Sequence, residues 1–253
     1  MNRVKAGIEG LDEMLAGGFL TESANLVEGA PGTGKTTLGM QFIYSGITQF
    51  GEPGLIMTFE EFPQQYYRDA ETLGWNLREL EQADKLRVIM TSPEVSSADL
   101  EQAGGRIGAL AREIGAKRIL VDSLSHFERL STDPVELRNM IYSFINALKR
   151  EGLTSVLTRE SPVLIGESDS AEEDAAFVAD SYIMLRYVEI ESAIRKALLV
   201  LKLRGSDHAK DIRQFEITSS GIEVRSKFEG REGILSGSPR RMSESFIEAF
   251  VRR

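Results

Sequence analysis

The 253-residue sequence predicts an α/β fold: a mainly parallel β-sheet with helices on both faces and an antiparallel β extension toward the C-terminus. Apolar β-type runs alternate with amphipathic segments of helical length over the first 180 residues. A glycine-rich loop joins the first of these strands to the first of these helices. After residue 180, strand-like runs follow one another with only short polar turns between them.

Five strands and four helices are expected in the first part of the chain. The strands are short runs rich in β-branched and large apolar residues, over 24–27, 55–59, 86–90, 119–121 and 154–158. Apolar residues recur at helical spacing between them, which predicts helices over 35–48, 63–73, 98–114 and 134–149. The last helix has its own start signal, with Asp133 as N-cap, Pro134 in the first helical position and Glu136 placed to close a capping box. Because strand and helix alternate, neighbouring strands should be parallel.

The C-terminal part is expected to extend the same sheet. Its strand-like runs cover 181–188, 197–203, 213–218 and 222–225, and no linker separates them from the preceding elements. Residues 1–238 are therefore predicted to form one domain. Residues 239–253 should form an amphipathic helical tail, in which Ser243 is the N-cap, Met242 and Ile247 are spaced as a hydrophobic staple, and Phe246 and Phe250 continue an apolar stripe. Such a tail can pack on its own assembly or dock a protein partner.

Composition excludes several classes of site and partner. The chain has no cysteine, which removes disulfides, thiolate metal sites and a cysteine nucleophile, and its two histidines, His126 and His208, are too few for a zinc cluster of imidazoles. A net charge of −9 disfavours broad electrostatic capture of nucleic acid. No apolar stretch reaches membrane-spanning length and the N-terminus has no signal-peptide core, so a cytoplasmic protein is expected.

A phosphate-binding loop is the most specific feature of the sequence. Residues 29–36 read Gly-Ala-Pro-Gly-Thr-Gly-Lys-Thr, a complete G-x-x-x-x-G-K-[ST] pattern between a strand-like and a helix-like run. In such a loop the glycines let backbone N–H groups surround a polyphosphate, Lys35 reaches the β and γ oxygens, and the Thr36 hydroxyl ligates Mg²⁺. The sequence therefore predicts a nucleoside triphosphate bound by Gly29, Pro31, Gly32, Thr33, Gly34, Lys35, Thr36 and Thr37.

Acidic residues follow two of the expected strands, at the edge where an open parallel sheet binds ligands. Asp122 follows the run 119–121 and is predicted to face the Mg²⁺ held by Thr36, unless it is only a turn cap. Glu60 and Glu61 follow the run 55–59. Adjacent residues on an extended chain point to opposite sides, so one carboxylate can polarise a water toward the γ-phosphate while the other braces the site. Glu60 is the favoured base and a third candidate metal ligand, with Glu61 as its support; a solvated acidic turn is the alternative.

Four segments together resemble the KaiC group of RecA-type ATPases. They are the loop 29–37, Thr58-Phe59-Glu60-Glu61, the stretch 118–125 and, most specifically, Lys202-Leu203-Arg204-Gly205-Ser206-Asp207-His208. Two shorter stretches, 187–190 and 236–239, look like the second repeat of the group's two-repeat members. This chain has one phosphate-binding loop and no internal duplication, so it looks like a single-repeat member with a RecA-like fold.

The resemblance implies ATP and Mg²⁺ as cofactors and a homo-oligomeric ring, usually a hexamer, with a nucleotide at each subunit boundary. On that basis Lys202 and Arg204 reach the γ-phosphate of the neighbour's ATP, and Leu203, Ser206 and His208 contact the nucleotide from the same strand and turn. Without the resemblance, Lys202 and Arg204 would be interpreted as a solvated pair on one strand face and His208 as a turn residue.

Two residues depart from the pattern of the two-repeat members. The adjacent Ser-Thr pair that their second repeat autophosphorylates falls on Ala176 and Phe177, which cannot accept phosphate. The acidic residues nearby form either a solvated loop or a built-in negative charge: Glu167, Asp169, Glu172, Glu173 and Asp174. The sequence thus favours an ATPase that acts through a protein partner. The alternatives are a DNA-associated motor or recombination accessory, and an autokinase that modifies Ser168, Ser170 or Ser181.

Overall fold

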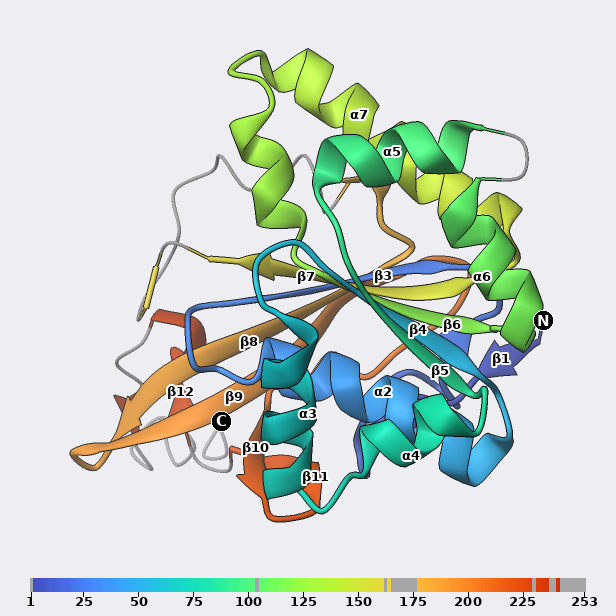
Figure 1. The fold of residues 1–253 in the computed structure, drawn as a ribbon. Helices are drawn as coiled ribbons and strands as arrows, with labels where there is room; N and C mark the ends of the chain where they lie inside the picture. Colours follow the sequence, from blue (N-terminus) through green and yellow to red (C-terminus); the bar gives the residue numbers. More distant parts are fainter. Residues whose placement is uncertain are drawn as a thin grey trace, which may run out of the picture.

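The computed structural model describes residues 2–102, 105–161, 163–164, 177–228, 231–236 and 240–241. Its main strands are β3 Ala24–Gly29, β4 Gly54–Thr58, β5 Leu86–Met90, β6 Arg118–Asp122, β7 Thr154–Glu160, β8 Ser181–Ile190, β9 Ala193–Leu203, β10 Arg213–Thr218 and β11 Gly221–Lys227. They form one nine-stranded sheet in the order β11-β10-β9-β8-β3-β7-β6-β4-β5 (Figure 1). The strands from β8 to β5 in that order are parallel, and β9, β10 and β11 are antiparallel, which confirms the predicted fold class.

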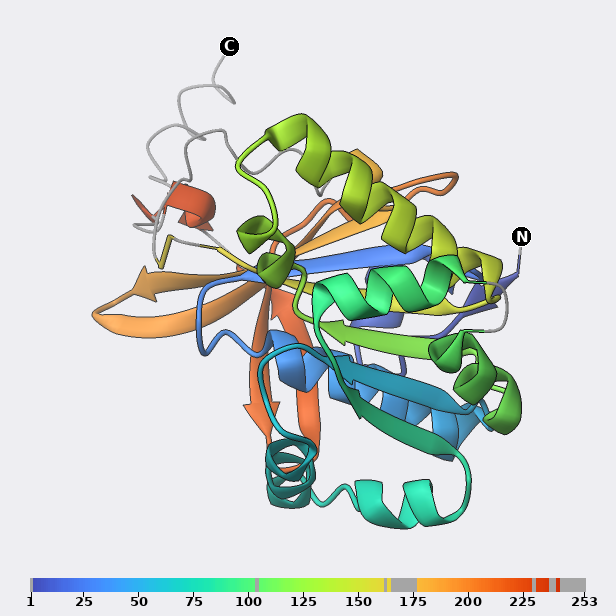
Figure 2. The ribbon, with the colours of Figure 1, turned by 45° about the horizontal axis from the view of Figure 1, so that its top comes forward.

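Helices cover both faces of this sheet. One face carries α2 Lys35–Phe50, α3 Pro63–Thr72 and α4 Leu77–Gln82, and the other carries α5 Pro93–Glu101, α6 Arg106–Ile114 and α7 Pro134–Arg150, as Figures 1 and 2 show. Successive residues of a strand face opposite sides, so Leu26 packs in the core on the α7 side while Val27 packs in the core on the α2 side. Burial on both faces explains why the parallel strands are continuous apolar runs in the sequence.

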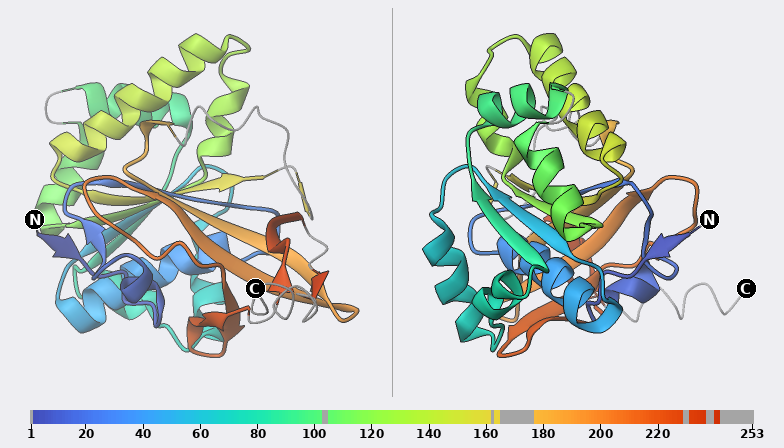
Figure 3. Two further views of the ribbon diagram at one scale, coloured as in Figure 1. Left: turned by 180° about the vertical axis from the view of Figure 1, so that it is seen from behind. Right: turned by 45° about the vertical axis from the view of Figure 1, so that its right-hand side comes forward.

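Short elements surround the main sheet. At the N-terminus, β1 Arg3–Val4 pairs with β2 Phe19–Leu20, with α1 Leu11–Met14 between them in sequence. Near the C-terminus, β12 Arg231–Glu232 pairs with β13 Arg240–Arg241, with the 3₁₀ turn η2 Ile234–Ser236 between them. A second 3₁₀ turn, η1 Leu124–Arg129, follows β6. Strands β8 and β9 form a long hairpin that projects beyond the rest of the sheet (Figure 3).

The helix predicted over 98–114 is wrong in its extent, because two helices share this segment. Helix α5 begins earlier, at Pro93, where the Ser92 hydroxyl accepts the Val95 N–H at 3.3 Å. Helix α6 begins at Arg106 because the Asp99 carboxylate caps it, accepting the N–H groups of residues 106 and 107 at 2.8 and 2.7 Å. Both helices bury apolar side chains in the same core, so the hydrophobic periodicity continues across the break between them.

Two glycines bring helix α2 close to the sheet. A Cβ atom on Gly39 would lie 2.3 Å from a methyl group of Leu120, and one on Gly46 would lie 2.4 Å from the Arg118 side chain. Arg118, the first residue of β6, is fully buried against α2, where it donates to the Phe42 carbonyl at 3.0 Å and pairs with Glu52 at 2.6 Å. These contacts fix α2, and with it the glycine-rich loop that precedes the helix, against the sheet.

Two predictions concern segments that lie wholly or mostly outside the described residues, the C-terminal tail and the acidic stretch before β8. Of the tail predicted over 239–253, Arg240 and Arg241 form β13 and the rest lies outside the described residues. Ala176 and the acidic residues 167–174 also lie outside them. None of the described helices combines the length and the apolar character needed to cross a membrane.

Candidate functional site

The phosphate-binding loop connects β3 to α2 at the carboxyl edge of the parallel strands. Gly32 and Gly34 have φ angles of 74° and 111°, a conformation that other residues rarely adopt, so both positions require glycine. The Lys35 ammonium donates to the Ala30 carbonyl at 3.1 Å, and the Thr33 hydroxyl donates to the same oxygen at 2.8 Å. Helix α2 begins at Lys35, so the free N–H groups of its first turn lie at the loop. This arrangement suits a bound phosphate.

Burial and neighbouring carboxylates act on the Lys35 ammonium group in opposite directions. Desolvation by burial lowers the pKa of its ammonium group, and the carboxylates of Glu160, Asp122 and Glu28 counter part of this effect by raising it. A polyphosphate beside the ammonium group would likewise raise the pKa of Lys35. Binding a phosphate would therefore favour the charged form of Lys35.

The structure brings Asp122 and Thr36 together. The Thr36 hydroxyl donates to Asp122 Oδ2 at 2.8 Å, and the Tyr66 hydroxyl donates to the same oxygen at 2.8 Å. The Thr158 hydroxyl donates to the other carboxylate oxygen, Oδ1. Asp122 ends β6, which lies between β4 and β7 in the sheet. Because a hydroxyl and a carboxylate are oxygen ligands of the kind that Mg²⁺ prefers, Thr36 and Asp122 fit this ion.

Tyr66 and Thr158 are site residues that the sequence analysis missed. Thr158 is the last residue of a predicted strand, and the rule that ligands bind at the carboxyl ends of parallel strands could have found it. Tyr66 lies on α3, where its ring contributes to the core and only its hydroxyl reaches Asp122. Burial, followed by the Asp122 carboxylate, raises the pKa of Tyr66, so its hydroxyl remains protonated and acts as a donor.

Glu60 and Glu61 lie in a bend after β4. The strand ends at Thr58, whose hydroxyl accepts the N–H of Glu61 at 3.1 Å and that of Glu60 at 3.4 Å. The predicted extended conformation is therefore wrong, because Thr58 closes a turn directly after the strand. Glu60 is 72% exposed and its Oε2 atom lies 3.2 Å from His126 Nε2. Desolvation, followed by the Asp122 carboxylate, raises the pKa of Glu61.

The segment 202–208 lies toward the amino ends of the parallel strands, whereas the phosphate-binding loop lies at their carboxyl ends. Lys202 of β9 faces Tyr182 of β8, which in turn faces Leu26 of β3. Since Gly29 ends β3, Lys202 lies about 10 Å from the loop along the strands and about 10 Å across them. The structure therefore does not bring the following residues to the loop of their own chain: Lys202, Leu203, Arg204, Ser206 and His208.

The two cations of this segment contact the chain just before β8. Lys202 donates to the Ala179 carbonyl at 2.7 Å, and Arg204 donates to the Phe177 carbonyl at 2.8 Å. Burial, followed by the charge of Arg204, lowers the pKa of the Lys202 ammonium. Arg204 nevertheless remains half-exposed, with 50% of its side-chain surface accessible. Part of the Arg204 side chain is therefore accessible to solvent.

Ser206 and His208 lie in the turn after β9. The Arg3 guanidinium donates to the Ser206 hydroxyl, and the Ala209 N–H donates to the Met14 carbonyl at 2.9 Å. The Nδ1 atom of His208 is buried and has no hydrogen-bond partner among the described residues. The N-terminal segment of the same chain therefore anchors this turn.

Similar proteins identify the family. A family model for "ATPase: KaiC" matches residues 4–229, which is most of the chain. The chain belongs to the KaiC ATPase family. This confirms the resemblance found in the sequence and agrees with a RecA-like arrangement of the sheet.

Relatives in this family are about twice as long as this chain. It is 35% identical over 246 residues to the circadian clock protein KaiC3 of Synechocystis sp., with 97% of this chain and 48% of that protein covered. It is 36% identical over 241 residues to the circadian clock oscillator protein KaiC of Thermostichus vulcanus, with 95% and 46% covered. Identity to the KaiC of Acaryochloris marina is 35%, with 95% and 45% covered. The chain thus spans about half the length of the curated relatives that it matches.

In this KaiC-family domain, the β8–β9 hairpin adds two unpredicted side chains to the phosphate-binding loop. Lys196 donates to the Gly32 carbonyl at 3.0 Å, and the Tyr187 hydroxyl donates to the Pro31 carbonyl at 3.3 Å. The two residues face each other across the hairpin. Burial lowers the pKa of the Lys196 ammonium. Lys196 is thus a second cation beside the loop, supplied by the same chain.

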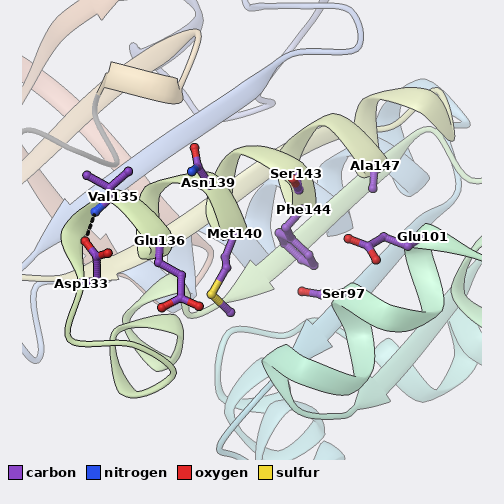
Figure 4. Close-up of a pocket in the computed structure, with 10 residues that line it drawn as sticks. All are labelled: Ser97, Glu101, Asp133, Val135, Glu136, Asn139, Met140, Ser143, Phe144 and Ala147. Atoms are coloured by element: carbon purple, nitrogen blue, oxygen red, sulfur yellow. Dashed lines mark hydrogen bonds between the residues drawn. The ribbon is translucent and has the colours of Figure 1, made fainter.

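A groove of about 460 Å³ lies between helices α5 and α7 (Figure 4). Its lining is mixed, with carboxylates at both ends and apolar side chains along α7: Ser97, Glu101, Asp133, Val135, Glu136, Asn139, Met140, Ser143, Phe144 and Ala147. Asp133 accepts the Val135 N–H at 2.9 Å and so caps α7 rather than facing a ligand. No residue of the predicted nucleotide site lines this groove, so the two are separate features.

Proposed function

We propose that this KaiC-family chain binds and hydrolyses Mg·ATP. The observation that carries the proposal is the 2.8 Å contact between Thr36 and Asp122, next to Lys35 at the start of α2. In this arrangement Lys35 and the N–H groups of the loop hold the phosphates, while Thr36 and Asp122 hold Mg²⁺. A Mg²⁺ ion held by Thr36 and Asp122 would supply positive charge to neutralise the charge that develops on the phosphates. Glu60 activates the attacking water and Glu61 supports it.

Removing the Lys35 ammonium tests nucleotide binding. Lys35→Ala should weaken Mg·ATP affinity by about a hundredfold, because the phosphates lose a half-buried charged partner. Titration with a fluorescent ATP analogue measures this affinity directly. Lys117→Ala is the matched control, since Lys117 is exposed at the other edge of the sheet and should bind the analogue like wild type. Equal affinity of Lys35→Ala and Lys117→Ala would contradict the proposed site.

The active site is proposed to be shared between subunits of a homo-oligomeric ring, which the family resemblance suggests is a hexamer. The positions of the two half-sites support this proposal. The loop lies at the carboxyl edge of the parallel strands and Arg204 lies at the opposite edge, so Arg204 can reach a phosphate-binding loop only in another copy of the chain. A cation supplied across the boundary would stabilise charge on the transferring phosphoryl group. ATP binding and assembly would then support each other.

A regulatory role through a protein partner is proposed for this activity. The relatives named above are circadian clock proteins, and the net charge of −9 does not favour a motor that moves on nucleic acid. Sedimentation with candidate partners in ATP and in ADP tests whether association depends on the nucleotide. An ATP-dependent and salt-dependent gel shift with single-stranded DNA would instead favour the DNA-associated alternative.

Hydrolysis should proceed without a stored phosphoenzyme. Phe177 carries no hydroxyl, and Ser181 is fully buried in β8, where it donates to Asn25 at 2.8 Å. After incubation with Mg·ATP, intact-mass measurement should therefore show the unmodified chain. Ser168 and Ser170 lie outside the described residues, and a stoichiometric phosphate mapped to either of them would make autokinase the better description.

A further inference from the structure

His126 lies against the carboxylate that we propose as the catalytic base. It belongs to η1, which begins two residues after Asp122, and its Nε2 atom lies 3.2 Å from Glu60 Oε2. The imidazole is 12% exposed, whereas the Glu60 side chain is 72% exposed. The Phe59 ring packs edge-on against the imidazole, with the ring centres 6.2 Å apart. A held imidazole thus contacts a carboxylate that has little else to restrain it among the described residues.

The turn that carries His126 is itself attached to the carboxyl edge of the sheet. The Glu160 N–H, at the end of β7, donates to the Ser125 hydroxyl at 2.9 Å. The Arg159 guanidinium donates to Glu128 at 3.3 Å. Phe127, the next residue after His126, packs against Phe59 from the same turn, with ring centres 5.9 Å apart. His126 therefore has a fixed position relative to the strand ends that also carry Asp122 and Thr158.

We propose that His126 is the positioning residue for Glu60. A carboxylate has only acceptors, so in this role the Nε2 atom of His126 must carry a hydrogen and donate it to Glu60 Oε2. Oε1 is then left to accept the proton of the attacking water. An exposed glutamate otherwise samples several rotamers, and a base outside its productive geometry contributes little to the reaction. The inference rests on the proposed function, since it assigns His126 a role only through Glu60.

Two amide substitutions separate positioning from packing. Glutamine places its amide nitrogen at about the reach of Nε2, whereas asparagine places it at about the reach of Nδ1. His126→Asn should lower kcat by about tenfold without changing ATP affinity, and His126→Gln should recover most of that loss. Equal losses in the two variants, or no loss in His126→Asn while Glu60→Gln is impaired, would overturn the positioning role.

A double-mutant cycle tests whether His126 acts through Glu60. In a Glu60→Gln background, His126→Asn should cause no further loss of turnover, because the residue it positions is already inactive. If the two substitutions lower turnover independently, so that their fold losses multiply in the double variant, the proposal is wrong. Wild-type turnover in Glu60→Gln alone would instead show that the proposed base is wrong, and the positioning role would fall with it.

Ring NMR signals of the nucleotide-free protein report the contact without any turnover. The chain has two histidines, so a ¹⁵N-labelled sample gives two sets of imidazole signals, which His126→Asn assigns. Glu60→Gln should shift the Nε2 signal of His126 and leave His208 unchanged. Glu61→Gln, which removes the adjacent carboxylate, is the matched control and should shift neither. An unchanged His126 signal in Glu60→Gln would show that the contact is absent and overturn the proposal, even if Glu60 proves to be the base.

Discussion

Glu60→Gln should keep Mg·ATP bound and lower kcat by about a hundredfold or more, because a neutral amide cannot take up a proton from water. In the reaction, the water oxygen bonds to the γ-phosphorus as the bond from that phosphorus to the departing ADP oxygen breaks, and the water proton passes to the carboxylate. The substitution retains the size and most of the polarity of the side chain. Phosphate release measured at saturating ATP, together with a binding titration, separates lost chemistry from lost binding.

Glu61 provides the comparison for this prediction. Desolvation and the nearby Asp122 carboxylate raise its pKa, which also makes it a stronger proton acceptor once it is ionised. Glu61→Gln should reduce turnover less than Glu60→Gln if Glu61 only supports the site. If Glu61→Gln loses turnover while Glu60→Gln keeps it, Glu61 is the base and the roles are reversed.

The fold was predictable because burial on both faces leaves a clear record in the sequence. Neighbours such as Leu26 and Val27 enter different cores, so each parallel strand is a continuous apolar run. Helix boundaries were less predictable where a side chain of the preceding helix decides them. The Asp99 carboxylate caps the first N–H groups of α6, and the spacing of apolar residues in the sequence gives no sign of that cap.

The phosphate-binding loop could be predicted because its chemistry depends on consecutive residues. Other members of the candidate site meet only through the sheet: Thr158 reaches Asp122 because β7 lies next to β6, and Lys196 reaches Gly32 through the register of the β8–β9 hairpin. A threonine in a strand or a lysine in a hairpin has no distinctive local pattern. The bend at Thr58 was missed for a related reason, since the strand was assumed to continue to Phe59.

Complementation between two inactive variants is expected if Arg204 acts on a neighbour's nucleotide. Arg204→Ala should lower turnover by about a thousandfold, as for other arginines that stabilise a transferring phosphoryl group. Lys35→Ala should have almost no turnover, because it binds nucleotide weakly and lacks the cation that reaches the γ-phosphate. In an equal mixture that forms rings at random, half of the loops are intact and half of these face an intact Arg204. The mixture should therefore recover about a quarter of wild-type activity, because each boundary in a ring pairs a loop from one copy with the opposite edge of the next.

The control for this mixture removes an arginine that lies elsewhere. Arg78 is exposed on α4 and stacks over Tyr67, so Arg78→Ala should have wild-type turnover and its equal mixture with Lys35→Ala should retain about half of it. Subunit exchange can be followed by energy transfer between labelled copies. If subunits exchange and the Arg204→Ala mixture is no more active than its parents, the site is not shared in the way proposed. If the protein remains a monomer at saturating ATP, the shared site is ruled out. Arg204 is level with Ala24, about 16 Å along the strands and about 10 Å across them from the loop of its own chain, which is too far for it to act there.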